Sequence, residues 1–199
     1  MSLLFETIRI QDGVTYTIEH HNQRMNQSRK LLLGCNNFID LKSLIIVPEN
    51  SRKGIYKCKV VYRTEIENIS FEPYIPRLIN SLKLVDDNTI CYEHKFSDRK
   101  PLEQLSLKRG HCDEILIVKN GSLTDTSFSN IVFFDGIQWI TPLNPLLQGT
   151  MRSYLLAEGY ISEKKISVRD LRYYQKARLI NAMLPLDSGS DIKISRIGY

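Results

Sequence analysis

The chain has 199 residues, of which 42% are hydrophobic and 25% are charged, and it carries a formal net charge of +5 at pH 7. This composition excludes a disordered chain, and the lack of an apolar run of membrane-spanning length argues against a membrane protein. The 27 basic residues are interleaved with 22 acidic ones and form no arm or stripe, so we expect a globular protein that binds no nucleic acid.

The first third of the chain alternates between strand and helix patterns. Residues 4–18 (LFETIRIQDGVTYTI) alternate in polarity on both sides of Asp12-Gly13, which predicts a β-hairpin. A helix is predicted from about residue 19 to residue 33, closed by Gly34. Residues 40–47 are ambiguous, whereas residues 56–62 and 66–71 alternate as strands do. This part therefore predicts hairpins packed on a helix, which is an α+β layer.

A composition shift at residues 84–88 indicates a domain boundary. We therefore predict a small α+β domain over residues 1–87 and a larger domain over residues 88–199. Asp135-Gly136 separates two short runs of β-branched and aromatic residues, which predicts a second hairpin. The other elements predicted in the larger domain are a helix at residues 101–109 and strands at residues 89–92, 115–118, 166–168, 179–182 and 192–194.

The stretch from residue 121 to residue 152 is the most informative part of the sequence. Asp125 lies just before the second hairpin, in a turn rich in Ser, Thr and Asn. Further on, Gly149 precedes a segment of helical composition, so the N–H groups of Gly149, Thr150 and Met151 would form an anion site at a helix start. A carboxylate and an anion site this close in sequence predict half of a cofactor site.

The same stretch resembles the signature of class IV aminotransferases, the fold-type IV enzymes that depend on pyridoxal 5'-phosphate (PLP). The matching segments, in chain order, are FETIR (5–9), HNQR (21–24), KFSDR (95–99), DTSFSNIVF (125–133), WITP (139–142) and GTMR (149–152). The resemblance implies two α/β domains with the cofactor site between them. It also implies a homodimer.

The resemblance assigns roles to individual residues. Lys95 would bond PLP through its amine and then move protons as the catalytic base. Asp125, in one motif with Asn130, would keep the pyridine nitrogen protonated, although the family more often has Glu at this position. Arg24 would bind the phosphate by charge, together with the backbone N–H groups at the helix start, which belong to Gly149, Thr150 and Met151.

A third segment favours one reaction. Residues 180–186 (INAMLPL) are similar to a loop of aminodeoxychorismate lyases, which makes Asn181, Ala182 and Met183 candidates for substrate binding. Such lyases release pyruvate from 4-amino-4-deoxychorismate and leave 4-aminobenzoate, a folate precursor. Thr7 matches a lyase threonine and would assist proton transfer. Because the substrate carries two carboxylates, candidates to bind them are Arg63, Arg99 and Arg152.

Each assignment has an alternative. A lysine is usually a solvated surface residue, Asp125 fits an ordinary turn, and Thr7 fits a strand interior. Arg99 and Arg152 could equally pair with Asp98 or with a helix end. For the whole protein, the alternatives are a class IV aminotransferase that acts on branched-chain or D-amino acids, or an inactive binding module that keeps the fold.

The sequence departs from the family in ways that bear on activity. It begins almost at the opening strand and is short before Lys95, so we expect a more open site. The tyrosine that aminotransferases carry after the lysine is absent, because Lys100 stands there.

The cysteines and the first residues bear on the compartment. Cys35, Cys58, Cys91 and Cys112 are widely spread, with no CxxC pair and no His at ligand spacing, so we expect reduced, mostly buried thiols and no metal site. The first residues show no secretory signal pattern, so we expect a cytoplasmic protein.

Overall fold

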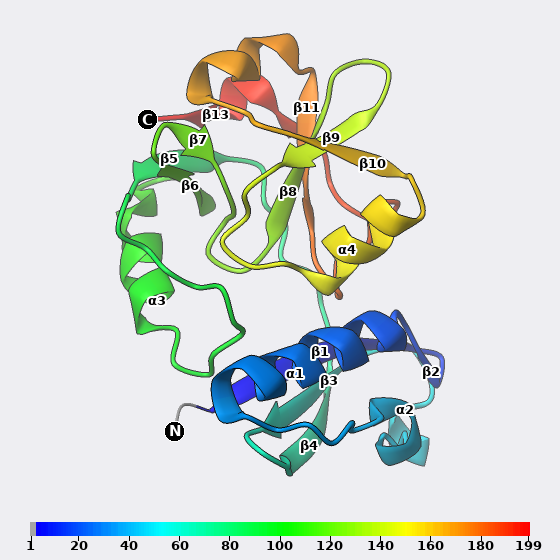
Figure 1. Ribbon diagram of the computed structural model, residues 1–199. Helices are drawn as coiled ribbons and strands as arrows, with labels where there is room; N and C mark the ends of the chain where they lie inside the picture. Colours follow the sequence, from blue (N-terminus) through cyan, green and yellow to red (C-terminus); the bar gives the residue numbers. More distant parts are fainter. Residues whose placement is uncertain (1–2) are drawn as a thin grey trace. The chain divides into compact units, whose positions relative to one another are not determined.

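The computed structural model describes residues 3–199, which form two compact units (Figure 1). The first unit comprises the chain up to Pro76 together with His94–Asp98. The second unit comprises Arg77–Glu93 and Arg99–Tyr199. Both units combine helices with sheets, as the sequence predicted, so the protein belongs to the α+β class.

The first unit is built on an antiparallel four-stranded sheet in the order β2-β1-β3-β4. Its strands are β1 (Leu4–Gln11), β2 (Val14–Thr15), β3 (Ile55–Tyr62) and β4 (Ile66–Pro73). Its helices are α1 (Ile18–Leu33), the short α2 (Leu41–Leu44) and the 3-10 turn η1 (Glu49–Ser51). The predicted first hairpin and the predicted helix that ends before Gly34 are both confirmed.

The two faces of this sheet differ because side chains alternate along β1. Leu4, Ile8 and Ile10 are fully buried in a core that includes Met25 of α1. Helix α1 therefore covers this face, as Figure 1 shows. The intervening residues of β1, which include Phe5 and Thr7, lie on the opposite face.

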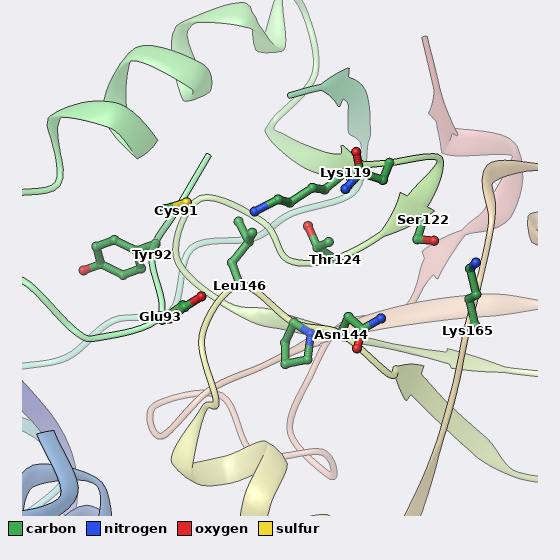
Figure 2. A pocket seen from close by; sticks show the side chains of 11 residues that line it. Cys91, Tyr92, Glu93, Lys119, Ser122, Thr124, Asn144, Leu146 and Lys165 are labelled. Atoms are coloured by element: carbon green, nitrogen blue, oxygen red, sulfur yellow. The ribbon is translucent and has the colours of Figure 1, made fainter. Parts of the chain in front are cut away.

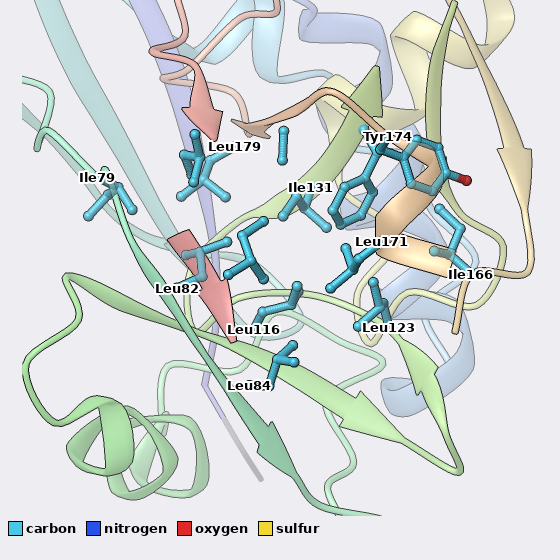
Figure 3. Close-up of a cluster of buried hydrophobic side chains, with 14 of the residues drawn as sticks. Ile79, Leu82, Leu84, Leu116, Leu123, Ile131, Ile166, Leu171, Tyr174 and Leu179 are labelled. Atoms are coloured by element: carbon cyan, nitrogen blue, oxygen red, sulfur yellow. The ribbon is translucent and has the colours of Figure 1, made fainter. Parts of the chain in front are cut away.

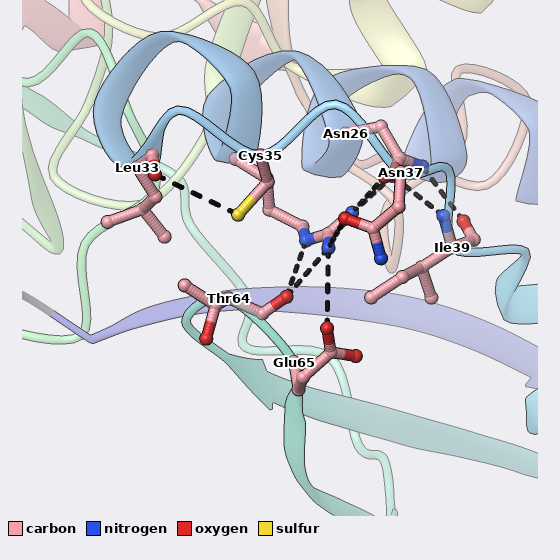
Figure 4. A network of polar contacts seen from close by, with 8 residues as sticks. Asn26, Leu33, Cys35, Asn37, Ile39, Thr64 and Glu65 are labelled. Atoms are coloured by element: carbon pink, nitrogen blue, oxygen red, sulfur yellow. Dashed lines mark hydrogen bonds and ion pairs between the residues drawn. The ribbon is translucent and has the colours of Figure 1, made fainter.

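A buried arginine ties α1 to the turn between β3 and β4 (Figure 4). Arg29 has no exposed surface, and its guanidinium donates to the backbone oxygens of Thr64, at 2.6 Å, and Asn37, at 2.8 Å. It also donates to the side chain of Asn26 at 2.9 Å. These bonds satisfy a charge that would otherwise be expensive to bury, so we assign Arg29 a structural role.

The second unit contains two sheets, in the orders β13-β5-β6-β7 and β10-β9-β8-β11-β12. Their strands are β5 (Leu82–Asp86), β6 (Glu114–Lys119), β7 (Ser122–Leu123), β8 (Asn130–Phe134), β9 (Trp139–Pro142), β10 (Ile161–Lys164), β11 (Lys176–Ile180), β12 (Ile192–Lys193) and β13 (Ile197–Gly198). The helices are α3 (Lys100–Ser106) and α4 (Thr150–Ala157), with 3-10 turns η2 (Leu107–Arg109), η3 (Val168–Tyr173) and η4 (Ile194–Arg196).

The core of the second unit joins its two sheets (Figure 3). Leu82, Leu84 and Leu116 come from the first of these sheets, and they pack in one cluster with Ile131 and Leu179 from the second. Burying side chains of this size contributes about 1.5–3 kcal/mol each. This cluster holds β8, and with it the segment that begins at Asp125, in a fixed position.

Most predicted elements of the second unit are confirmed, but two strands are not. The second hairpin joins β8 to β9, with a connection of residues 135–138. Residues 89–92 form no strand, because the Asp87 carboxylate accepts the backbone N–H groups of Thr89 and Ile90, at 2.8 and 2.9 Å, and makes a turn there. Residues 166–168 contribute a single β-bridge, between Ser167 and Ser122, and Ser167 is also the N-cap of η3.

The units divide the chain differently from the predicted boundary after residue 87. Residues 77–87 lie in the second unit because β5 pairs in parallel with β6. Residues 94–98 return to the first unit because the Phe5 N–H donates to the Lys95 oxygen at 3.0 Å and the Ser97 N–H donates to the Leu3 oxygen at 2.8 Å. Lys95 therefore belongs to the first unit.

The cysteines are free but less buried than expected. Cys58 is buried, Cys91 is exposed, and Cys35 and Cys112 are half-buried. The expectation of mostly buried thiols was wrong because the other three lie in loops near the surface. Within residues 3–199, no helix is both long and apolar enough to cross a membrane, and no group of three or more His, Cys, Asp or Glu residues could hold a metal ion.

Candidate active site

The first unit contains a buried carboxylate that binds two basic side chains. Glu6 lies on the face of β1 that α1 covers, and it has no exposed surface. Arg24 of α1 donates through Nε to Glu6 Oε1 at 3.0 Å and through Nη2 to Glu6 Oε2. His21 Nδ1 lies 2.6 Å from Glu6 Oε2. Glu6 thus fixes the guanidinium of Arg24, the predicted phosphate ligand, by a two-pronged contact.

The charges of this group follow from its surroundings. Burial alone would raise the pKa of Glu6, but the charge of Arg24 and the hydrogen bond from His21 outweigh burial and lower that pKa to about 2. Burial lowers the pKa of His21, although Glu6 partly offsets this effect. Glu6 is therefore ionised and His21 neutral at pH 7. An ionised carboxylate can only accept, so His21 carries its proton on Nδ1.

Lys95 lies beside this group at the edge of β1. Its backbone oxygen accepts the N–H of Phe5, and its Nζ is 4.7 Å from the centre of the Phe5 ring. The charge of Lys95 also contributes to the lowered pKa of His21, which indicates that the two groups are close. Thr7 lies on the same face of β1 as Phe5 and is half-buried. The structure thus brings Lys95 close to the Glu6–His21–Arg24 group within the first unit.

The second unit holds the other predicted carboxylate. Asp125 is 5% exposed; its Oδ1 accepts from Asn130 Nδ2 at 2.8 Å, and its Oδ2 accepts from the Leu147 N–H at 2.9 Å. Burial raises the pKa of Asp125 to about 6, although these two hydrogen bonds oppose the increase. Asn130 also donates to the Leu147 oxygen at 2.9 Å. Together these contacts hold Asp125 against the turn that leads into α4.

Gly149 allows this turn to pass close to Asn130. A Cβ atom at position 149 would lie 1.9 Å from Asn130 Oδ1, which no real side chain permits. Gly149 is also the N-cap of α4 and offers no side chain to the first turn, where Thr150 and Met151 are buried. An eight-residue helix that begins beside a buried carboxylate in this way suits an anionic group at its N-terminus.

The predicted lyase loop forms a tight turn in the second unit. Asn181 Oδ1 accepts the N–H groups of Met183, at 2.8 Å, and Leu184, at 3.0 Å. Its Nδ2 lies 3.5 Å from the Phe128 oxygen, in the motif that contains Asp125. Ala182 and Met183 are buried. Asn181 therefore shapes the loop and connects it to the Asp125 motif.

The predicted substrate arginines have partners within the protein. Arg152 is 3% exposed and donates to Glu163 at 2.6 Å and to the Pro142 oxygen at 3.0 Å, which indicates a structural role. Arg99 donates to the Ser127 oxygen at 2.5 Å. Arg63 of the first unit lies 3.3 Å from Glu67 in an exposed ion pair. Each of the three guanidinium groups therefore has a partner within the protein, although Nε of Arg99 and Nε of Arg152 are buried without a hydrogen bond.

A pocket of about 300 Å³ in the second unit lies beside the segment that contains Asp125, because Thr124 and Leu146 both line it (Figure 2). Its lining includes Cys91, Lys119, Thr124 and Lys165, and none of the predicted site residues. Lys119 Nζ already donates to the Ile90 oxygen at 2.6 Å, and the Thr124 hydroxyl donates to the Ile117 oxygen at 2.9 Å. We therefore assign this pocket no part in the predicted cofactor site.

Sequence reasoning missed Glu6 and His21. Both belonged to matching motifs, but no chemistry was assigned to either. One signal was available: Glu6 occupies an inward position of β1, between Leu4 and Ile8, where a charged residue needs a buried partner. The identity of that partner depends on how α1 packs, which the local pattern does not reveal.

Comparisons with known proteins identify the family. Residues 102–187 match the model of the amino-transferase class IV family. A solved candidate 4-amino-4-deoxychorismate lyase from Haemophilus somnus 129PT shares 36% identity, covering 94% of this chain and 98% of that one, with a TM-score of 0.87. The protein therefore belongs to the class IV aminotransferase family.

Two more distant matches agree with this assignment. A candidate aminodeoxychorismate lyase from Schizosaccharomyces pombe is 27% identical, over 81% of this chain and 76% of that protein. A PLP-bound hypothetical aminotransferase from Mycobacterium tuberculosis is 19% identical, with a TM-score of 0.75, covering 96% of this chain and 80% of that one. The latter shares the fold.

Proposed function

We propose that this protein is a PLP-dependent 4-amino-4-deoxychorismate lyase, which releases pyruvate and forms 4-aminobenzoate for folate synthesis. The observation that carries the proposal is Asp125, a buried carboxylate held by Asn130 next to the start of α4. Such a group is suited to a cationic ring nitrogen, and an anion-binding helix end follows a few residues later. The protein's membership of the class IV family supports the same reading, since this family uses PLP.

The available side chains fit PLP chemically. Lys95 supplies an amine, Arg24 and the N-terminus of α4 supply positive charge for a phosphate, and Asp125 supplies a carboxylate for the ring nitrogen. Ionising Asp125 in its buried surroundings is unfavourable, as its pKa of about 6 indicates. A protonated ring nitrogen beside it would relieve this penalty. When bound, PLP supplies a ring that accepts the electrons left when a proton or group departs.

The remaining steps fall to residues of this chain. With PLP held at the site, the Lys95 amine would take the proton from the substrate ring carbon that carries the amino group. As the bond between the ring and the ether oxygen of the enolpyruvyl group breaks, the protonated Lys95 amine would return this proton to the methylene carbon of that group, which leaves as pyruvate. Thr7, on the Phe5 face of β1, is the candidate to assist Lys95 in these transfers. Arg24, held by Glu6, would keep the phosphate in place throughout.

The Asn181 loop favours the lyase over the alternatives. The sequence of this loop is similar to that of aminodeoxychorismate lyases, and its turn is held by Asn181, which also contacts Phe128. The similar proteins from Haemophilus somnus and Schizosaccharomyces pombe carry lyase names. The second candidate is an aminotransferase acting on branched-chain or D-amino acids, which the family match equally accommodates. An inactive binding module is the third. We also retain the predictions of a cytoplasmic location and a homodimer.

The test combines spectroscopy with an assay. Purified protein with added PLP should show the visible absorbance of a PLP–lysine adduct, and Lys95→Ala should abolish it. Pyruvate should then appear from aminodeoxychorismate without an added keto acid. Keto-acid-dependent conversion of the cofactor to its amine form, without pyruvate release, would identify an aminotransferase instead. Failure to take up PLP would contradict both enzyme functions and leave the binding module.

A further inference from the structure

The pocket of the second unit lies where three polar side chains point away from the core (Figure 2). Leu123 and Ile166 belong to that core, and the Leu123 N–H donates to the Ile166 oxygen at 2.8 Å. Neighbouring residues of an extended chain point to opposite sides. Ser122, Thr124 and Lys165 therefore point away from the core, and all three line the pocket.

A second lysine reaches the pocket from β6. Lys119 is paired with Ser122 in the antiparallel register, so the two side chains point to the same side of the sheet. Lys119 Nζ donates to the Ile90 oxygen at 2.6 Å, which uses one of the three N–H donors of an ammonium group. In the part of the chain that the structure describes, the side chains of Lys165 and Ser122 make no hydrogen bond and no ion pair. The pocket thus offers two ammonium groups and a hydroxyl to a ligand.

The rest of the lining limits the kind of ligand. Two lysines against the single carboxylate of Glu93 leave the lining with a net positive charge, which suits an anion. None of the described lining residues is an arginine, the residue that binds phosphate through two parallel hydrogen bonds. Pro145 and Leu146 add an apolar wall that a bare inorganic anion would leave unused. A carboxylate on a compact apolar body therefore fits this pocket best.

The apolar wall also carries hydrogen bonds to Asp125. The side chain of Leu146 lines the pocket, whereas its backbone N–H donates to the Asp125 carboxylate. The N–H of Leu147 donates to Asp125 Oδ2 at 2.9 Å. A ligand packed on Leu146 would therefore stabilise the loop conformation that supplies both donors. These donors favour an ionised Asp125, which is the form that suits a cationic ring nitrogen.

We propose that this pocket is a second ligand site, which binds a small organic acid and strengthens PLP binding when it is occupied. The carboxylate would bind to Lys165 and Ser122, the charge of Lys119 would add to the attraction, and the apolar body would pack on Leu146. Coupling between two sites is reciprocal, so bound PLP strengthens the binding of the acid by the same factor. The acid site is independent of the reaction, whereas the coupling rests on the proposed use of PLP.

Calorimetric titration of the full chain with sodium benzoate tests the acid site. Wild type should bind benzoate, and benzamide, which has the same ring without the charge, should bind about tenfold more weakly. Lys165→Ala should weaken benzoate binding about tenfold, because a charged hydrogen bond is lost. Lys164→Ala is the matched control, since it removes the neighbouring exposed lysine, which does not line the pocket, and it should bind as wild type does.

Three results of this titration would overturn the proposal. They are no binding of benzoate by wild type, equal binding by Lys165→Ala and wild type, and binding of inorganic phosphate as tightly as benzoate. The first would leave the pocket to water, the second would place benzoate elsewhere on the protein, and the third would mean that the apolar wall contributes nothing.

An absorbance titration with PLP tests the coupling. Saturating benzoate should lower the half-saturating PLP concentration of wild type about fivefold, which corresponds to a modest coupling between sites. The same benzoate should leave PLP binding by Lys165→Ala unchanged. An unchanged or raised half-saturating concentration in wild type would overturn the coupling. If the protein takes up no PLP, the proposed function and the coupling both fail, and the calorimetry still decides whether the pocket binds organic acids.

Discussion

At the scale of single residues, Glu6 is the buried charge on which the first unit depends. Its pKa of about 2 lies well below the ordinary value of 4.5. A carboxylate whose folded pKa is depressed stabilises the native state above its unfolded pKa and loses that contribution as the pH falls toward the folded one. Burial lowers the pKa of His21, which likewise makes the folded state less stable as the pH falls below 6.5. The first unit should therefore be sensitive to acid.

Replacing Glu6 with Gln tests this expectation. At pH 7 the variant should have a free energy of unfolding lower by about 3 kcal/mol, the equivalent of the pKa shift. This difference should shrink between about pH 4.5 and pH 2, because over that range Glu6 takes up a proton in the unfolded chain while it stays ionised in the folded one. Urea unfolding of the cofactor-free protein at a series of pH values measures both quantities.

The control for this prediction is the exposed carboxylate Glu72. Glu72 forms an ion pair with Lys57 at 2.7 Å and its side chain is 56% exposed, so Glu72→Gln should change stability little. A Glu6→Gln variant with wild-type stability at every pH would contradict the assigned role of Glu6.

The candidate site shows which residue-level features a sequence can reveal. Lys95, Arg24 and Asp125 could be proposed as site residues because they lie in segments that resemble the motifs of the class IV family. The hydrogen bonds from Arg24 to Glu6 could not be predicted, because they join residues of α1 and β1 that meet only when α1 packs on the sheet. The partner of Arg152 could not be predicted either, because Glu163 lies on β10, which pairs with β9 in the folded sheet.

At the scale of elements, the connection from β9 to α4 depends on one glycine. Gly149 has ordinary backbone angles, φ −71 and ψ 142, so its requirement is for space rather than for conformation. Gly149→Ala would drive a methyl group into Asn130 Oδ1. Asn130 would have to move, and its hydrogen bonds to Asp125 and to the Leu147 oxygen would be lost.

We therefore expect Gly149→Ala to destabilise the protein by about 2–4 kcal/mol and to weaken PLP binding. Thermal unfolding and an absorbance titration with PLP measure the two effects. Gly198→Ala is the matched control, because a Cβ there meets nothing within 4 Å and the φ of Gly198 is not positive. Equal stability of the two variants would show that Asn130 does not need its present position.

Local patterns predicted elements well where one face is buried and the turn residues are distinctive. The hairpin of β1 and β2 was identified from Asp12-Gly13, which both have positive φ. The strand predicted at residues 89–92 failed because the Asp87 side chain takes up the backbone N–H groups that a strand would use. A pattern of residue types does not reveal this competition.

At the scale of the whole molecule, the chain crosses between its units more than once. The sequence located a boundary near residue 87, but residues 94–98 return to pair with the first residues of the chain. Such pairing links residues about ninety positions apart, and composition carries no information about it. Its consequence is that the candidate PLP ligands come from both units, Lys95 and Arg24 from the first and Asp125 and Thr150 from the second.

PLP should therefore stabilise the protein as a whole. A ligand at a hundredfold excess over its Kd stabilises the native state by about 2.7 kcal/mol. For a chain of this size that corresponds to an increase in Tm of about 5–10 °C. Calorimetry with and without PLP measures the increase and shows whether both units share it.

Two lysine variants distinguish specific binding from random reaction of PLP with surface amines. Lys95→Ala should lose most of the increase in Tm, because the bond to the cofactor is gone. Lys42→Ala removes an exposed lysine of α2 and should keep the full increase. A rise in Tm that survives Lys95→Ala undiminished would mean that PLP stabilises the protein without bonding to Lys95. The catalytic role proposed for that lysine would then be wrong.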